Sequence, residues 1–143
     1  MTIIEPKGVH YYQPLWTLVG GGLKKIKESS RPMSSILPKE TRWIQKSIKS
    51  FDPGTDVVQL DDGTKIPYDY LVIAIGMVAR FDQIPGALKA LNDKNSGVVS
   101  IYDSDYAMKT ARVLGELRQG KVIFTLPTTQ VINFQFLTNN TLL

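Results

Sequence analysis

The sequence predicts an α/β fold, and three stretches carry this prediction. Residues 70–76, YLVIAIG, form a nearly continuous apolar run, which is typical of a strand buried on both faces of a parallel sheet. Residues 56–70, DVVQLDDGTKIPYDY, predict a β-hairpin, because Asp62-Gly63 supplies the positive φ values that a tight turn requires. Residues 103–119 carry apolar side chains at helical spacing.

The first part of the chain alternates short elements with turns. The β-branched run at residues 2–4 predicts a strand that ends near Glu5, since Pro6 cannot continue a central strand. Residues 7–14 are expected to form a loop. Apolar side chains recur at roughly helical spacing over residues 15–28, but the glycine triplet at 20–22 predicts a broken or short helix.

The remaining elements follow from alternation and from terminator residues. Residues 42–51 alternate apolar and polar side chains before Asp52-Pro53-Gly54, which has the chemistry of a turn. Residues 81–100 are expected to form a loop. The helix at 103–119 has Asp103 as its predicted N-cap and Gly120 as its predicted C′ residue. Residues 121–125, KVIFT, predict one more strand, and the uncharged stretch that follows has no clear period.

Composition excludes several classes of function. The 143 residues contain no cysteine and one histidine, which excludes disulfides, thiolate metal sites and a cysteine nucleophile within this sequence. The net charge is +4, and eight of the basic residues lie between Lys24 and Lys49. We interpret this segment as a solvated face, and we expect no nucleic-acid partner because no RNA-binding signature accompanies it. No apolar run approaches the roughly 20 residues of a membrane helix.

Three features could carry chemistry. An acid at the end of a strand, here Glu5, can accept hydrogen bonds from both hydroxyls of a ribose, although such a residue is more often an exposed charge. The turn Ala74-Ile75-Gly76 would let backbone amides approach a cofactor closely, although Gly76 could simply end the strand. Residues 10–22, HYYQPLWTLVGGG, place Gln13 among aromatic side chains and suit a flat partner with a polar edge. The order of acid, β-meander and apolar strand is that of dinucleotide domains that bind FAD.

The sequence resembles the mitochondrial branch of the sulfide:quinone oxidoreductases from about residue 2 to residue 129. The likeness lies in IIEP, HYYQPLWTLVGGG, RPMSSILP, WIQKSI, YDYLVIAIG, SIYDSDYAMKT and GKVIFTLPTT, in family order. It implies an incomplete, Rossmann-like FAD-binding domain with a β-meander over residues 1–120. Residues 121–143 would hold the first strand of a second dinucleotide-binding-like domain, followed by a tail that does not match the family.

The resemblance also implies a function. Family members oxidise hydrogen sulfide with an FAD-linked cysteine pair and pass the electrons to ubiquinone, at the matrix side of the mitochondrial inner membrane. By position, Glu5 would hold the adenosine ribose and the backbone of Ile48 would meet the adenine. Ala74 and Gly76 would lie near the pyrophosphate, and Gln13 would lie against the flavin.

The sequence departs from the family at both ends. Family members begin with a strand and a glycine-rich phosphate loop, and they carry a cysteine shortly after the position of IFTLPTT. We therefore expect a chain truncated at both ends that neither holds FAD tightly nor oxidises sulfide by itself. Two alternatives stay open at this point. The chain could be part of another FAD-dependent NAD(P)H, quinone or ferredoxin reductase, or it could be a noncatalytic binding protein that uses its basic segment.

Overall fold

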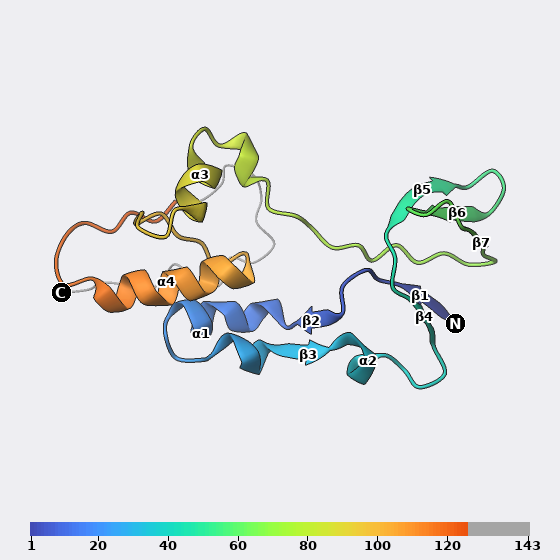
Figure 1. Cartoon of the computed structure of the whole chain (residues 1–143), viewed down its shortest axis with the longest axis horizontal. Coiled ribbons are helices and arrows are strands. Elements are labelled where there is room, and N and C mark those ends of the chain that lie inside the picture. Colours follow the sequence, from blue (N-terminus) through green and yellow to red (C-terminus); the bar gives the residue numbers. More distant parts are fainter. Residues whose placement is uncertain (126–143) are drawn as a thin grey trace.

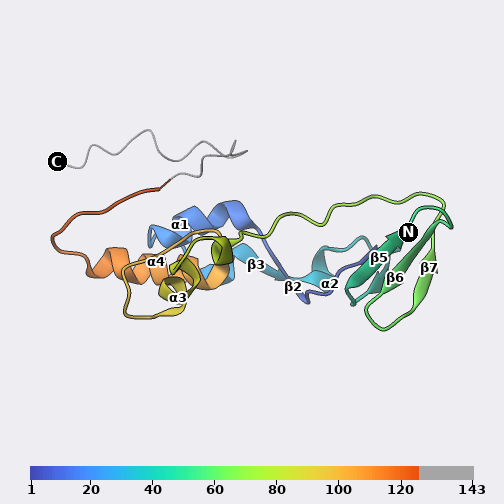
Figure 2. The same ribbon diagram turned by 90° about the horizontal axis from the view of Figure 1, so that it is seen from above.

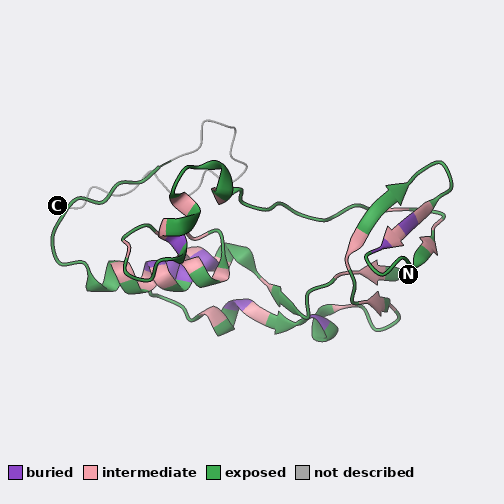
Figure 3. Ribbon diagram, turned by 45° about the horizontal axis from the view of Figure 1, so that its top comes forward, coloured by how far each residue is buried: buried purple, intermediate pink, exposed green. Residues whose placement is uncertain are grey.

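The described chain is elongated, with strands at one end and helices at the other. The structure is a computed structural model that describes residues 1–125. Figures 1 and 2 show that a ribbon of β2 (Val9–Tyr11) and β3 (Ser30–Pro32) leads from the strands to the helices. A second, extended connection between the two ends lies between β7 (Lys65–Pro67) and α3 (Ala87–Asn92). Buried residues lie in the helices of one end and in the strands of the other, and Met33 is buried between them (Figure 3).

Two small sheets form the strand end. The parallel pair consists of β1 (Thr2–Ile4) and β4 (Arg42–Ile44), and the antiparallel meander consists of β5 (Ile48–Asp52), β6 (Val57–Leu60) and β7 (Lys65–Pro67). Val58 and Leu60 of β6 are 2% and 1% exposed, so the middle strand carries the core of this end. The predicted hairpin is therefore confirmed, with the correction that Gly63 (φ +86°) but not Asp62 takes a positive φ.

A two-stranded ribbon corrects the loop expected at residues 7–14. Strand β2 (Val9–Tyr11) pairs in antiparallel fashion with β3 (Ser30–Pro32), with His10 opposite Arg31. The short helix α2 (Met33–Ile36) follows directly, and the Met33 N–H donates to the Gly8 carbonyl at 2.8 Å. The segment forms a strand because it pairs with a partner about twenty residues away in the sequence, which local patterns do not reveal.

The helical end is built on a close contact between α1 (Trp16–Gly20) and α4 (Ser104–Glu116). Trp16 and Val19 pack with Ala107 of α4 in one buried cluster. A Cβ atom added at Gly20 would lie 2.7 Å from Cγ2 of Ile101, so only glycine lets the chain approach this closely. The predicted break after α1 is confirmed, since a separate 3₁₀ helix, η2 (Ile26–Ser29), follows the glycines.

Helix α4 begins as predicted and ends earlier than predicted. The Asp103 carboxylate accepts a hydrogen bond from the Asp105 N–H at 2.9 Å, which makes Asp103 the N-cap. The helix ends at Glu116 with Leu117 as its C-cap, so Gly120 is not its C′ residue. The expected loop at 81–100 is also corrected, because it contains the 3₁₀ helix η3 (Phe81–Gln83) and α3 (Ala87–Asn92).

Two predicted strands are absent from the described residues. Residues 70–76 are extended but unpaired, and Val72 is 86% exposed. Residues 121–125 also form no strand, and Ile123 is 83% exposed. Both predictions are wrong for the same reason, since a strand needs a neighbour to satisfy its backbone and none lies beside these segments within residues 1–125. The tail predicted to lack a regular period lies mostly at 126–143, outside the described residues.

Candidate functional site

Glu5 lies at the carboxyl end of β1, where the chain leaves the parallel pair. Its N–H donates to the Ile44 carbonyl at 3.1 Å, and its carbonyl accepts from Nε1 of Trp43 at 2.9 Å. These two bonds attach its backbone to β4. The Oε1 atom accepts from the Lys7 N–H at 2.7 Å, and within residues 1–125 no donor reaches Oε2. Glu5 is half-buried, so one carboxylate oxygen is held in place while the other is available to a ligand.

Ile48 begins β5 and presents its backbone away from the meander. The Asp61 N–H donates to the Ser47 carbonyl at 2.9 Å, and Ile48 is registered opposite Leu60. This pattern makes Ile48 and Leu60 a non-hydrogen-bonded antiparallel pair, in which the N–H and C=O of Ile48 point away from β6. The backbone of Ile48 is therefore free, within the described chain, to pair with a group on the outer edge of β5.

The five residues expected to meet FAD do not converge at one point. Glu5 and Ile48 belong to β-elements at the strand end of Figure 1. Gln13 is exposed at the start of the 3₁₀ helix η1 (Gln13–Leu15), which leads into α1 at the helical end. Ala74 and Gly76 lie in the exposed segment that connects the two ends, where Gly76 has a φ of +70°.

The glycine triplet serves protein packing at one position at least. Gly20 is buried against Ile101 and Thr110, the two side chains nearest to an added Cβ. The Thr110 hydroxyl donates within α4 and to the preceding segment, with the carbonyls of Tyr106 and Ser100 at 2.8 and 2.9 Å. The surface that approaches Gly20 is thus formed by α4 and by Ile101 just before it, whereas the sequence had suggested a flat ligand for this stretch.

Three carboxylates have lowered pKa values, and all are exposed and paired with a basic side chain. The Lys46 ammonium and the Thr64 N–H lower the pKa of Asp62 to about 2. Lys24 lowers the pKa of Glu28, and Arg80 lowers the pKa of Asp82. These pairs stabilise turns and short helices, and none of them includes a residue expected to meet FAD.

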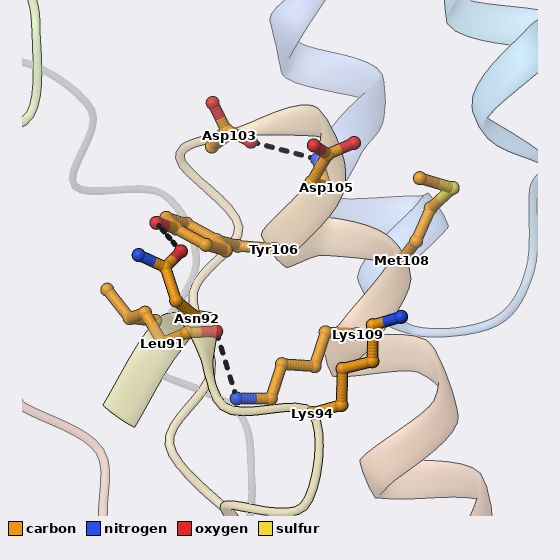
Figure 4. A pocket seen from close by; sticks show the side chains of 8 residues that line it. All are labelled: Leu91, Asn92, Lys94, Asp103, Asp105, Tyr106, Met108 and Lys109. Carbon is orange, nitrogen blue, oxygen red and sulfur yellow. Dashed lines mark hydrogen bonds between the residues drawn. The ribbon is translucent and has the colours of Figure 1, made fainter. Parts of the chain in front are cut away.

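A hollow of about 490 Å³ opens between α3 and the first turns of α4 (Figure 4). The surface of its wall is polar and apolar in about equal parts, and it is formed by Leu91, Asn92, Lys94, Asp103, Asp105, Tyr106, Met108 and Lys109. The Tyr106 hydroxyl and Oδ1 of Asn92, 2.9 Å apart, close one side of it. Sequence reasoning missed this hollow because it treated residues 81–100 as a loop. The available signal was Lys109, a charged residue spaced three positions after Tyr106 on the predicted apolar face of the helix.

The described residues contain neither a cluster of metal ligands nor a membrane-spanning helix. No group of three or more His, Asp or Glu side chains that could hold a metal ion occurs within residues 1–125. Over the same residues, none of the helices has the length and hydropathy needed to cross a bilayer. The open Oε2 of Glu5 and the open backbone edge of Ile48 fit the adenosine half of a dinucleotide, which offers ribose hydroxyls and an adenine edge.

Comparisons with known proteins identify the family of this chain. The pyridine nucleotide-disulphide oxidoreductase family matches residues 1–123. The mitochondrial sulfide:quinone oxidoreductase of Dictyostelium discoideum is 43% identical over 132 residues, and that of Mus musculus is 34% identical over 131. Each comparison covers 92% of this chain, and the chain spans about 29% of the length of these relatives.

Solved structures show the same fold. The crystal structure of the sulfide:quinone oxidoreductase from Aquifex aeolicus matches with a TM-score of 0.61 and 28% identity, over 80% of this chain and 25% of that one. The NDH2 structure from Plasmodium falciparum, at 20% identity and a TM-score of 0.56 over 77% of this chain and 23% of that one, shares the fold. The predicted α/β class and its Rossmann-like FAD-binding fold are thereby confirmed. This chain belongs to the pyridine nucleotide-disulphide oxidoreductase family, and within it the resemblance to the sulfide:quinone oxidoreductases is confirmed.

Proposed function

We propose that this chain supplies the adenosine-binding side of the FAD site of a sulfide:quinone oxidoreductase. The observation that carries the proposal is the position of Glu5. Its carboxylate stands at the carboxyl end of a parallel strand, with one oxygen bonded to the Lys7 N–H and the other without a donor in the described residues. A carboxylate at this place in a dinucleotide fold accepts hydrogen bonds from the ribose hydroxyls.

The distribution of the other expected contacts supports an extended dinucleotide rather than a compact ligand. The strand end holds Glu5 and Ile48, the connecting segment holds Ala74 and Gly76, and the helical end holds Gln13 (Figure 1). This order is the order of adenosine, pyrophosphate and flavin along FAD. We propose that these five residues line the cofactor in that sequence, with the backbone of Ile48 pairing with the edge of the adenine.

The chemistry of the whole enzyme needs groups beyond these residues. Sulfide oxidation in this family requires a cysteine pair, and the 143 residues contain no cysteine. The role proposed for this chain is therefore to bind and orient the cofactor, which would supply electron transfer from sulfide to ubiquinone. The names of its relatives support a place in mitochondria, and we propose the matrix side of the inner membrane as the site of action.

Competition binding tests the proposal on the chain itself. FAD binding is measured by fluorescence anisotropy, with ADP and FMN as competitors. We expect weak binding that ADP displaces and FMN does not, because the contacts of Glu5 and Ile48 address the adenosine half. Glu5→Gln should weaken binding by about tenfold, since a hydrogen bond to a charged group contributes about 1.5–3 kcal/mol.

Glu40→Gln is the matched control, because Glu40 is an exposed glutamate outside the expected site. Equal displacement by FMN and ADP, or equal binding by the Glu5→Gln and Glu40→Gln variants, would contradict the proposal. Sulfide-dependent reduction of a short-chain ubiquinone analogue is expected to stay at the rate without protein. Turnover by the chain alone would show that the chemistry does not need further residues.

A further inference from the structure

The ammonium group of Lys109 lies in a cage of four oxygen atoms. Its Nζ donates to the carbonyls of Ala90, Leu91 and Val98 at 2.9, 3.1 and 2.8 Å, and to Oγ of Ser96 at 3.0 Å. Figure 4 shows the side chain reaching from α4 to the Leu91 carbonyl. The acceptors come from the end of α3 and from the connection between α3 and α4, so one cation joins three parts of the fold.

The cage is built from acceptors that have few other donors. Ala90 and Leu91 lie in the last turn of α3 (Ala87–Asn92), where carbonyl groups have no partner within the helix. The Ser96 hydroxyl donates its own proton to the Ala90 carbonyl, and its oxygen accepts from Lys109 and from the Val98 N–H. None of the four oxygens belongs to a carboxylate. The cage therefore recognises N–H donors and positive charge without a counter-ion, aided by the negative end of α3.

The numbers of donors and acceptors define which cation fits the cage. A lysine ammonium has three N–H donors, and four oxygens lie within hydrogen-bond distance of Nζ, so one donor is shared. A free primary alkylammonium ion carries the same three N–H donors on a nitrogen that is bonded to one carbon. Ammonium itself has four donors, whereas a tetramethylammonium ion has none.

We propose that this cage is a binding site for a primary ammonium cation, filled in the native chain by Lys109. The site orders residues 93–100 against α4 and shapes the hollow beside α3. Removal of the side chain leaves the four acceptors in need of a donor, so a soluble primary amine takes the place of the missing group. The site is separate from the expected FAD contacts and does not depend on cofactor binding.

Chemical rescue of Lys109→Ala tests this proposal in the full chain. Hydrogen exchange is followed by mass spectrometry on peptides that cover residues 87–100. We expect exchange in these peptides to rise by about tenfold in the variant, because four acceptors, of which those of Ala90, Leu91 and Ser96 are buried or half-buried, lose a charged donor. Propylammonium chloride should restore most of the protection, and methylammonium and ammonium chloride less of it, since propylammonium also refills the path of the lysine stem.

Three controls separate this site from general effects. Tetramethylammonium and sodium chloride at equal ionic strength should not restore protection. Lys109→Met, which keeps most of the stem and blocks the path, should lose protection without rescue by any amine. Lys89→Ala removes an exposed lysine of α3 itself and should exchange like the native chain.

Three results of the exchange experiment would contradict the proposed ammonium site. Unchanged exchange in Lys109→Ala would show that the cage holds nothing in place. Loss of protection that no primary amine reverses, including a variant that stays unfolded in every salt, would assign Lys109 a packing role only. Equal rescue by tetramethylammonium would show a response to ionic strength.

Discussion

Strand β6 and the segment at residues 70–76 are both short and rich in β-branched residues, yet only β6 is a strand. β6 lies between β5 and β7, and its Val58 and Leu60 are 2% and 1% exposed. The segment at 70–76 has no strand beside it in the described chain, and its Ile73 and Ile75 are 58% and 78% exposed. Similar composition therefore leads to opposite burial.

The difference teaches that the presence of a neighbour decides whether a β-prone sequence becomes a strand. The neighbours of β6 are close in sequence, because a tight turn at Gly63 and a turn at 52–56 bring both of them alongside. A parallel strand of the kind predicted at 70–76 needs partners that are distant in sequence. Helix α4 needs no such partner for its backbone, since its hydrogen bonds are internal.

The largest expected effect is the loss of stability when a buried aliphatic side chain of β6 is shortened, measured against the same change at an exposed side chain of residues 70–76. Leu60→Ala should lower the free energy of unfolding by about 2–5 kcal/mol, because it leaves a cavity in the core of the meander. Ile73→Ala should change it by less than about 0.5 kcal/mol, since the side chain already faces solvent. Urea denaturation followed by circular dichroism measures both values.

The Leu60→Ala and Ile73→Ala variants directly test the contrast between buried β6 and exposed residues 70–76. A loss of more than about 1 kcal/mol in the Ile73→Ala variant would mean that the segment at 70–76 is buried in solution and that a neighbour covers it. A small loss in Leu60→Ala would mean that the meander contributes little to stability. Either result would remove the contrast between the two stretches.

A smaller effect is expected at Gly20, where the helical end depends on a close approach. In Gly20→Ala the new Cβ would meet Ile101 at 2.7 Å, and such overpacking costs about 1–3 kcal/mol, of which helix propensity returns about 1 kcal/mol. We expect a net loss of about 1 kcal/mol in thermal or urea unfolding. In Gly21→Ala the new Cβ meets nothing closer than the Thr17 carbonyl oxygen at 3.4 Å. A larger loss in this control than in Gly20→Ala would contradict the assigned contact.

The smallest effect is a pH dependence at the turn of the meander. The Lys46 ammonium and the Thr64 N–H lower the pKa of Asp62 from 3.8 to about 2. Because the folded pKa lies below the unfolded one, this carboxylate stabilises the fold above about pH 4, and the contribution is lost as the pH falls through about 2. Asp62→Asn should unfold at a slightly lower urea concentration than the native chain at pH 5, and the gap should narrow towards pH 2.

Asp69→Asn serves as the control for this measurement, because Asp69 is exposed and its carboxylate makes no hydrogen bond within residues 1–125. A gap between Asp62→Asn and the native chain that stays constant from pH 5 to pH 2 would show that the carboxylate charge does not stabilise the turn. The effect is small because the Asp62 side chain is 38% exposed to solvent.

The residues of the candidate site remain predictions from the sequence, and their arrangement came only from the structure. Glu5 follows the β-branched run at residues 2–4 and precedes Pro6, and β1 ends at Ile4, one residue before Glu5. The open backbone edge of Ile48 follows from its register with Leu60, which only the paired strands define. The cage around Lys109 joins residues up to 19 positions apart, and no local sequence pattern predicts it. The proposed contacts of Gln13, Ala74 and Gly76 with FAD remain predictions.

The sequence by itself determined the elements whose hydrogen bonds close locally: the start of α4 at Asp103, the meander around Gly63 and the break after α1 at the glycines. The family also followed from the sequence, because its motifs are contiguous. Only the tertiary structure decided the pairing of β2 with β3, the approach of α4 to Gly20 and the exposure of residues 70–76. The physical reason is that burial and strand pairing depend on partners distant in the chain, whereas caps and turns satisfy their backbone groups within a few residues.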